Sequence, residues 1–140
     1  MKIRLHKFLD LWLPVILWAA FIFKLSSGAV PVASHIFWQD FAVKKTGHFI
    51  LFGFLAILIY RGLIGYGMKK KKAAFYSVFL AFFYGATDEF HQIYTQGREA
   101  RVRDVFIDGL GAWAAAYFVY GLLPKFPKKI KIWGSRLGFI

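Results

Sequence analysis

The sequence contains no cysteine. Disulfide bonds, a cysteine nucleophile and a zinc site built on thiolates are therefore excluded. Acidic residues are also scarce, with seven Asp and Glu against nineteen Lys and Arg in 140 residues. The chain has no glycine-rich phosphate loop and no Ser-His-Asp pattern of the kind that hydrolases use. Most common types of catalytic site are therefore excluded, and the few acidic residues become the main candidates for function.

Apolar side chains dominate what is there. They make up 59% of the residues, and 21% are aromatic, which is more than an ordinary soluble domain carries. Mean hydropathy is +0.50, and the apolar blocks are about as long as a bilayer is thick. We predict a single all-α membrane domain over residues 1–140, a bundle of four transmembrane helices. The expected helices cover residues 8–25, 46–67, 73–94 and 102–123, with a loop between the first two and a basic tail over 124–140.

The first apolar segment resembles a signal peptide because Lys2 and Arg4 precede it. The small residues at 26–29 (SSGA) form no A-x-A cleavage site, and further apolar segments follow. We therefore predict that this segment is a retained helix.

The net charge of +12 is distributed in short basic runs beside the apolar segments. That placement is typical of anchors next to anionic lipid and not of a groove that binds nucleic acid. Membrane lipid is accordingly the predicted partner, and nucleic acid is not. The positive-inside rule places the N-terminus, the lysine run 69–72 and the tail in the cytoplasm. Both termini are therefore predicted to be cytoplasmic, and no oligomeric state follows from the sequence.

Most of the seven acids fall between residues 88 and 108. A helix rises about 1.5 Å per residue, so Asp88 lies roughly 24 Å from Lys72, and Asp108 roughly 25 Å from Lys125. His48 reaches a similar level on the second helix. Because charge in an apolar surround is costly, groups that share one level on three helices indicate a functional cluster near the outer membrane surface.

The candidate residues divide into two groups. Candidates for proton transfer are His91, Asp88, Glu89 and His48. Asp88 and His91 are three residues apart and share a helix face, so the carboxylate would orient the ring. The candidate ligand-binding residues are Lys45, Gln92, Arg98, Arg101, Arg103, Asp104 and Asp108. Their arginines suit phosphate or carboxylate groups.

No cofactor is predicted and no metal site is assigned. His48, His91, Asp88 and a carboxylate from the fourth helix would form a usable N/O set, but their spacing matches no specific metal motif.

A second reading assigns the cluster a structural role. Arginines 98, 101 and 103 would pair with Asp88, Glu89, Asp104 and Asp108 and hold the helices together, as buried ion pairs do. The protein would then be a membrane scaffold without catalysis. A transporter is disfavoured because the polar groups lie at one end only and no inverted repeat is found.

Three sequence blocks carry a family resemblance. They are residues 45–49 (KTGHF), 87–92 (TDEFHQ) and 104–111 (DVFIDGLG), with Gly97-Arg98 between the last two and 24–28 (KLSSG) upstream. Together they resemble the VanZ-like family over most of the chain. Two positions depart from the family pattern: Gln96 stands where proline often precedes Gly-Arg, and Asp108 where asparagine is frequent. The second departure adds a charge to the cluster.

The resemblance implies a small multi-helix protein of the bacterial plasma membrane and cell envelope. The family's namesake is associated with low-level resistance to the glycopeptide teicoplanin. On this reading the outward-facing polar pocket binds or modifies an anionic lipid-linked or glycopeptide-related ligand. The matching positions are Lys45, His48, Asp88, Glu89, His91, Gln92, Gly97, Arg98, Asp104 and Asp108.

Overall fold

The computed structural model describes residues 2–28, 35–95 and 101–139, with the side chains of residues 2–4 left out. Helices make up 86% of the described residues, which form no strand. The order is α1 (Lys2–Ser26), α2 (Phe37–Gly65), α3 (Lys70–Gln92), α4 (Val102–Tyr117) and α5 (Lys128–Arg136). A π turn, η1 (Phe118–Leu122), and a 3-10 turn, η2 (Leu123–Lys125), continue α4. The prediction of an all-α chain is confirmed.

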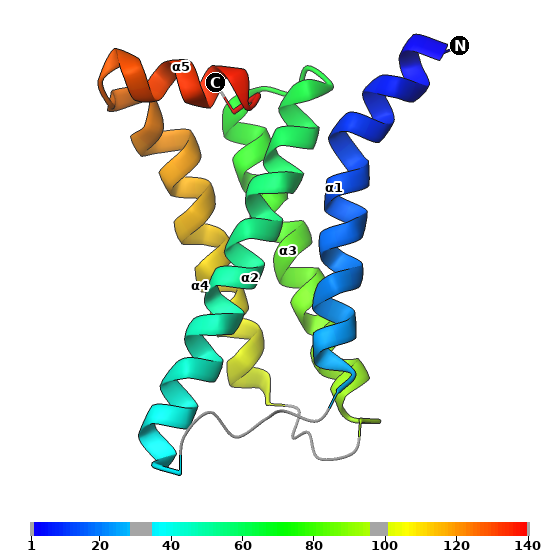
Figure 1. Cartoon of the computed structure of the whole chain (residues 1–140), viewed down its shortest axis with the longest axis vertical. Helices are drawn as coiled ribbons and strands as arrows, with labels where there is room; N and C mark the ends of the chain where they lie inside the picture. Colours follow the sequence, from blue (N-terminus) through cyan, green and yellow to red (C-terminus); the bar gives the residue numbers. More distant parts are fainter. Residues whose placement is uncertain (1, 29–34, 96–100, 140) are drawn as a thin grey trace.

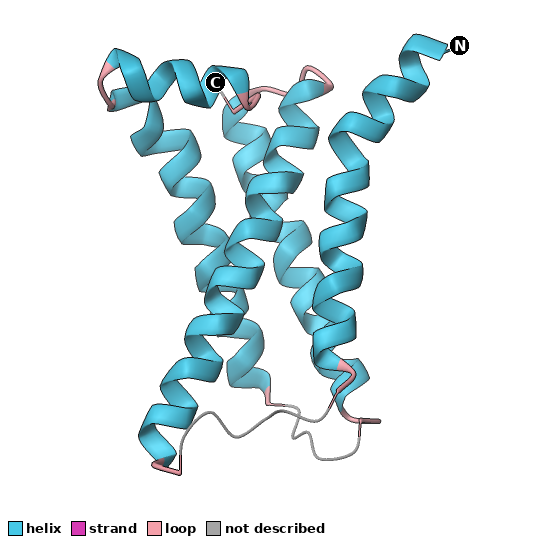
Figure 2. Ribbon diagram, viewed as in Figure 1, coloured by secondary structure: helices cyan, strands magenta, loops and turns pink. Residues whose placement is uncertain are grey.

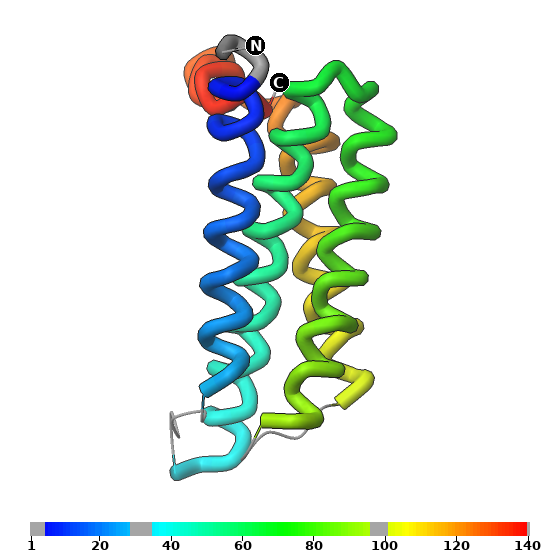
Figure 3. The backbone as a smooth tube through the Cα atoms, turned by 90° about the vertical axis from the view of Figure 1, so that its right-hand side faces the viewer, coloured from blue at the N-terminus to red at the C-terminus, as the bar shows by residue number. Residues whose placement is uncertain are grey.

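The four long helices run along one axis, and their connections lie at the two ends (Figures 1, 2 and 3). The N-terminus, the C-terminus and the α2–α3 turn share one end, at the top of Figure 1. The opposite end gathers the end of α1 and of α3 and the start of α2 and of α4. The two ends of the chain therefore lie at the same end of the bundle, and their cytoplasmic location stays a prediction.

Among the described residues, three helical stretches are long and apolar enough to cross a membrane: Leu5–Ser26, Phe37–Gly65 and Val102–Lys125. The third predicted span, α3, is not among them, because it begins with lysines and carries Asp88 and Glu89 near its end. Large apolar side chains are exposed along every long helix, as expected of a surface that contacts lipid. The protein is therefore a membrane protein, and the count of four spans remains a prediction.

The start of α2 differs from the sequence expectation. A loop was expected as far as residue 45, but the helix begins at Phe37. Two local interactions favour the extra turns. Asp40 and Lys44 form an i,i+4 ion pair at 2.6 Å, and Phe37, Trp38 and Phe41 make mutual ring contacts. Such pairs stabilise helices by a few tenths of a kcal/mol each, about 0.2–0.5. The extension places Phe41 and Lys45 on an ordered helix beside α4.

Helix α2 forms the centre of the bundle. Its Phe52, Leu55 and Ala56 are at most 1% exposed and pack with Ala81 of α3 and Ala112 of α4. The backbones of α2 and α4 approach closely at Gly111, where an added Cβ would lie 2.2 Å from the Phe49 carbonyl oxygen. The absence of a side chain on Gly111 permits this approach. The contact fixes the depth of Asp108, three residues earlier on α4.

Candidate functional site

A polar cluster occupies the end of the bundle where α1 and α3 finish and α4 begins. Its buried members come from all three of these helices, and α2 contributes two partly buried side chains. The cluster consists of Ser26, Lys45, His48, Asp88, Glu89, Gln92, Asp104 and Asp108. The surrounding surface of the bundle is apolar. The prediction that ionisable groups from three helices share one level agrees with this arrangement.

Asp88 joins α3 to α1. Its Oδ2 accepts a hydrogen bond from Ser26 Oγ at 2.8 Å and another from Gln92 Nε2 at 2.9 Å. Asp88 is 3% exposed, so both bonds form away from bulk water and are stronger for it. Neither donor carries a charge, so Asp88 is held here by hydrogen bonds and by no cation among the described residues.

His91 does not pair with Asp88 as its spacing predicted. Its Nε2 lies 3.1 Å from Ser27 Oγ, and its ring lies against Phe23 with centroids 4.4 Å apart. The i,i+3 relation places two residues on one helix face, but burial of Asp88 turns its carboxylate inward while His91 meets the end of α1. No described contact makes Asp88 the orienting partner of His91.

Asp104 forms the ion-pair part of the cluster. It bonds to the Lys45 ammonium of α2, and its other oxygen, Oδ1, lies 3.7 Å from Arg103 Nε. That second distance is too long for a hydrogen bond. The Arg103 guanidinium also lies over the Phe41 ring, 4.8 Å from its centroid. Arg103 is half exposed at this end of the bundle, with a side-chain exposure of 52%.

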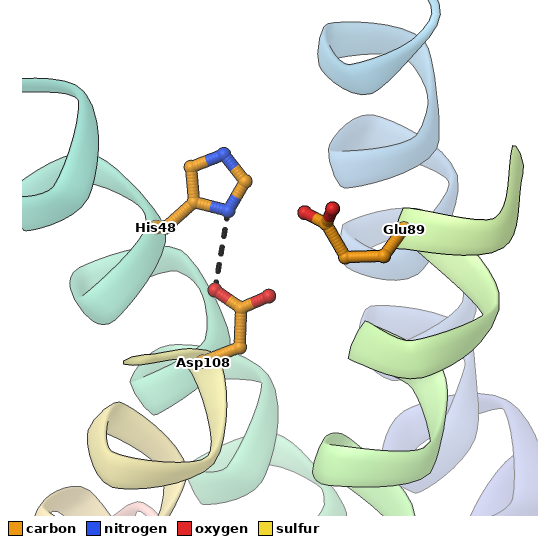
Figure 4. Close-up of side chains that lie close together, drawn as sticks. All are labelled: His48, Glu89 and Asp108. Atoms are coloured by element: carbon orange, nitrogen blue, oxygen red, sulfur yellow. Dashed lines mark hydrogen bonds and ion pairs between the residues drawn. The ribbon is translucent and has the colours of Figure 1, made fainter. Parts of the chain in front are cut away.

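The deepest group is Asp108. It is fully buried, and its Oδ1 lies 3.1 Å from His48 Nδ1 on α2. The His48 ring is nearly parallel to that of Phe52, with an interplanar angle of 10°. Figure 4 shows Glu89 reaching from α3 towards this pair. An added Cβ on Gly85 would lie 3.2 Å from Asp108 Oδ2, so the glycine makes room for the carboxylate.

Glu89 is anchored through one oxygen. Its Oε2 accepts the backbone N–H of Arg101 at 2.9 Å, and the residue is 5% exposed. Arg101 therefore contributes a backbone N–H to the site, whereas the sequence predicted a role for its guanidinium. The bond also ties the start of α4 to the end of α3.

Four buried carboxylate oxygens in this cluster have no hydrogen-bond partner among the described residues. They are Asp88 Oδ1, Glu89 Oε1, Asp104 Oδ1 and Asp108 Oδ2. An unpaired buried acceptor costs about 1–3 kcal/mol, and more when it is charged. The cluster therefore has a surplus of acceptors and can receive hydrogen-bond donors or a cation.

The structure unites most of the predicted ligand-binding residues but not all. Lys45, Gln92, Asp104 and Asp108 belong to the cluster, Arg103 stands at its edge, and Arg98 lies outside the described residues. Ser26 was not predicted as a site residue although it bonds directly to Asp88. The signal that could have found it is the stretch 24–28 (KLSSG), which contains Ser26 and contributes to the family resemblance.

Comparison with known proteins supplies the remaining observation. The family model described as VanZ/LLP1 matches residues 7–123.

The chain belongs to the VanZ/LLP1 family.

The match spans α1 to the 3-10 turn after α4 and includes all three blocks that carried the resemblance. The amphipathic α5 lies beyond it. Searches of curated proteins and of solved structures found no match. The cluster is thus part of the VanZ-like region of this membrane protein.

Proposed function

We propose that this VanZ-like protein binds the polar headgroup of an anionic, lipid-linked molecule of the bacterial cell envelope at the polar end of its bundle. The observation that carries the proposal is the set of four carboxylate oxygens that have no hydrogen-bond partner among the described residues, beside the half-exposed Arg103. A sugar-phosphate headgroup has matching chemistry, because its hydroxyls donate to carboxylates and its phosphate accepts from a guanidinium.

An apolar groove supports the choice of a lipid-linked ligand. It has a volume of about 620 Å³ and lies between α3 and α4. Phe79, Phe82, Phe106 and Leu110 are among its lining residues. Phe106 lies between Asp104 and Asp108 along α4, so the groove reaches the same level along the bundle as the cluster.

The proposal also covers the orientation of the cluster in the membrane and its role in resistance. The cluster faces outward from the plasma membrane, as the basic opposite end favours. Binding there contributes to teicoplanin resistance, an expectation that rests on the family resemblance. If the bound headgroup is also modified, His91 at the end of α3, whose Nε2 lies 3.1 Å from Ser27 Oγ, is the candidate for proton transfer.

Binding to polyprenyl phosphate, with uncharged polyprenol as the comparison, tests the proposal on purified protein in detergent. We expect the phosphate to bind at least tenfold more tightly, because a charge-assisted hydrogen bond contributes about 1.5–3 kcal/mol. Arg103→Gln should remove most of that difference. Lys128→Gln, on α5 at the other end, should keep it. Equal binding of the two lipids by the wild type would refute the proposal.

The scaffold reading has one observation in its favour: Asp88 ties α1 to α3 through uncharged donors. Teicoplanin susceptibility of a sensitive Gram-positive host separates the two. At matched membrane levels, Asp88→Asn keeps the shape of the side chain and should reduce protection if the cluster binds ligand. Protection equal to that of the wild type would favour the scaffold.

A further inference from the structure

Three residues of the cluster form a compact group of their own. His48 from α2, Glu89 from α3 and Asp108 from α4 each offer one nitrogen or oxygen atom, and these atoms lie within 4.8 Å of one another. Figure 4 shows the carboxylate of Glu89 directed towards the His48–Asp108 pair. Three separate helices therefore converge on one point.

Two of these residues each carry a buried oxygen that makes no hydrogen bond to a described residue. Glu89 Oε1 and Asp108 Oδ2 have no hydrogen-bond partner among the described residues, and the two residues are 5% and 0% exposed. Two carboxylates brought this close repel each other and disfavour joint ionisation. A cation between them would remove the repulsion and satisfy both oxygens at once.

We propose that His48, Glu89 and Asp108 bind a divalent cation, with Zn²⁺ or Mn²⁺ as the best match. One imidazole nitrogen and two carboxylates form an N/O ligand set that both ions accept. Three protein ligands leave a coordination position open for water or for a phosphate oxygen.

The groups around the three ligands hold them in place, as a metal site requires. The Arg101 N–H occupies Glu89 Oε2 and leaves Oε1 for the ion. The Phe52 ring lies parallel to the His48 ring. Gly85 lets Asp108 lie against α3, where a side chain would meet its Oδ2 at 3.2 Å.

This ligand set differs from the one that the sequence spacing suggested. Asp88 is engaged by Ser26 and Gln92, and His91 by Ser27 and Phe23. Neither belongs to the converging group. The proposal thus makes His48 a metal ligand and His91 not, and this difference can be tested.

The experiment measures metal binding by the purified full-length protein after chelator treatment. Titration calorimetry with Zn²⁺ and with Mn²⁺ should give one ion per chain for the wild type. Glu89→Gln and His48→Gln should each bind at least tenfold more weakly. His91→Gln should bind as the wild type does, and Asp10→Asn, at the opposite end of the bundle, controls for adventitious carboxylate binding.

Thermal unfolding with and without the metal provides a second measurement in case a variant is unstable. An ion that binds only the folded state raises the Tm, so Zn²⁺ or Mn²⁺ should raise the Tm of the wild type and of His91→Gln but not of Glu89→Gln. The absence of binding by the wild type would overturn the proposal. So would a Glu89→Gln or His48→Gln variant with wild-type affinity, or an equal loss in His91→Gln. Because the metal alone is the probe, the result does not depend on the lipid proposal.

Discussion

Substitution of Gly111 by alanine should separate α2 from α4 and disturb the polar cluster next to the contact. The new Cβ would lie 2.2 Å from the Phe49 carbonyl oxygen and 2.9 Å from the Phe49 carbonyl carbon and Cα. Ordinary carbon–oxygen contacts are near about 3.5 Å, so the helices must part by roughly 1 Å. The obstructing atoms are backbone, and no side-chain rotation can relieve the overlap.

The magnitude follows from two opposing effects. Alanine is favoured over glycine inside a helix by about 0.5–1 kcal/mol, while overpacking of a close contact costs about 1–3 kcal/mol and occasionally more. We expect Gly111→Ala to be destabilising by about 1–2 kcal/mol. Gly47 of α2 is the matched control, because a Cβ there meets nothing within 4 Å. Gly47→Ala should therefore be neutral or stabilising.

Unfolding by sodium dodecyl sulfate from mixed micelles, followed by circular dichroism, compares the two variants with the wild type. Gly111→Ala should unfold at a lower detergent fraction and Gly47→Ala at an equal or higher one. If both variants unfold together, close backbone contact at Gly111 does not limit the packing of α2 on α4.

Two further predictions concern contacts away from the cluster. Tyr84→Phe removes a 2.7 Å hydrogen bond to the Ala19 carbonyl and should be destabilising by about 1 kcal/mol in the same unfolding assay; an unchanged midpoint would contradict this. Arg61 donates to the Leu137 carbonyl at 2.9 Å and to the Asp10 side chain at 2.9 Å. Arg61→Gln should therefore loosen α5 and speed tryptic cleavage at its lysines. Asp10→Asn should change cleavage less, and equal rates for Arg61→Gln and the wild type would show that Arg61 does not hold the tail.

The sequence by itself determined the class of the protein. In lipid, the backbone N–H and C=O groups of a spanning segment can be paired only in helices or closed barrels. The apolar composition and the length of the blocks therefore predicted an all-α membrane fold. Three blocks of polar residues were specific enough to indicate the family. The level of the cluster also followed, because a fixed rise of about 1.5 Å per residue converts sequence position into depth.

The tertiary structure decided which polar groups meet. Spacing on one helix predicted a partnership of Asp88 with His91, but the end of α1 supplies Ser26 to the first and Ser27 to the second. No periodicity within α3 encodes what a helix more than sixty residues away brings to it. The early start of α2 has a local origin instead, since aromatic contacts and the Asp40–Lys44 pair within the same turns favour a helix over a loop.

The convergence of His48, Glu89 and Asp108 depended on packing in the same way. The sequence offered four acids and two histidines in the relevant blocks, and many combinations of them were possible. The backbone approach at Gly111 sets how far α4 slides along α2, and that depth places Asp108 beside His48. Helix geometry determines which residues share a face, whereas contacts between helices determine which faces meet.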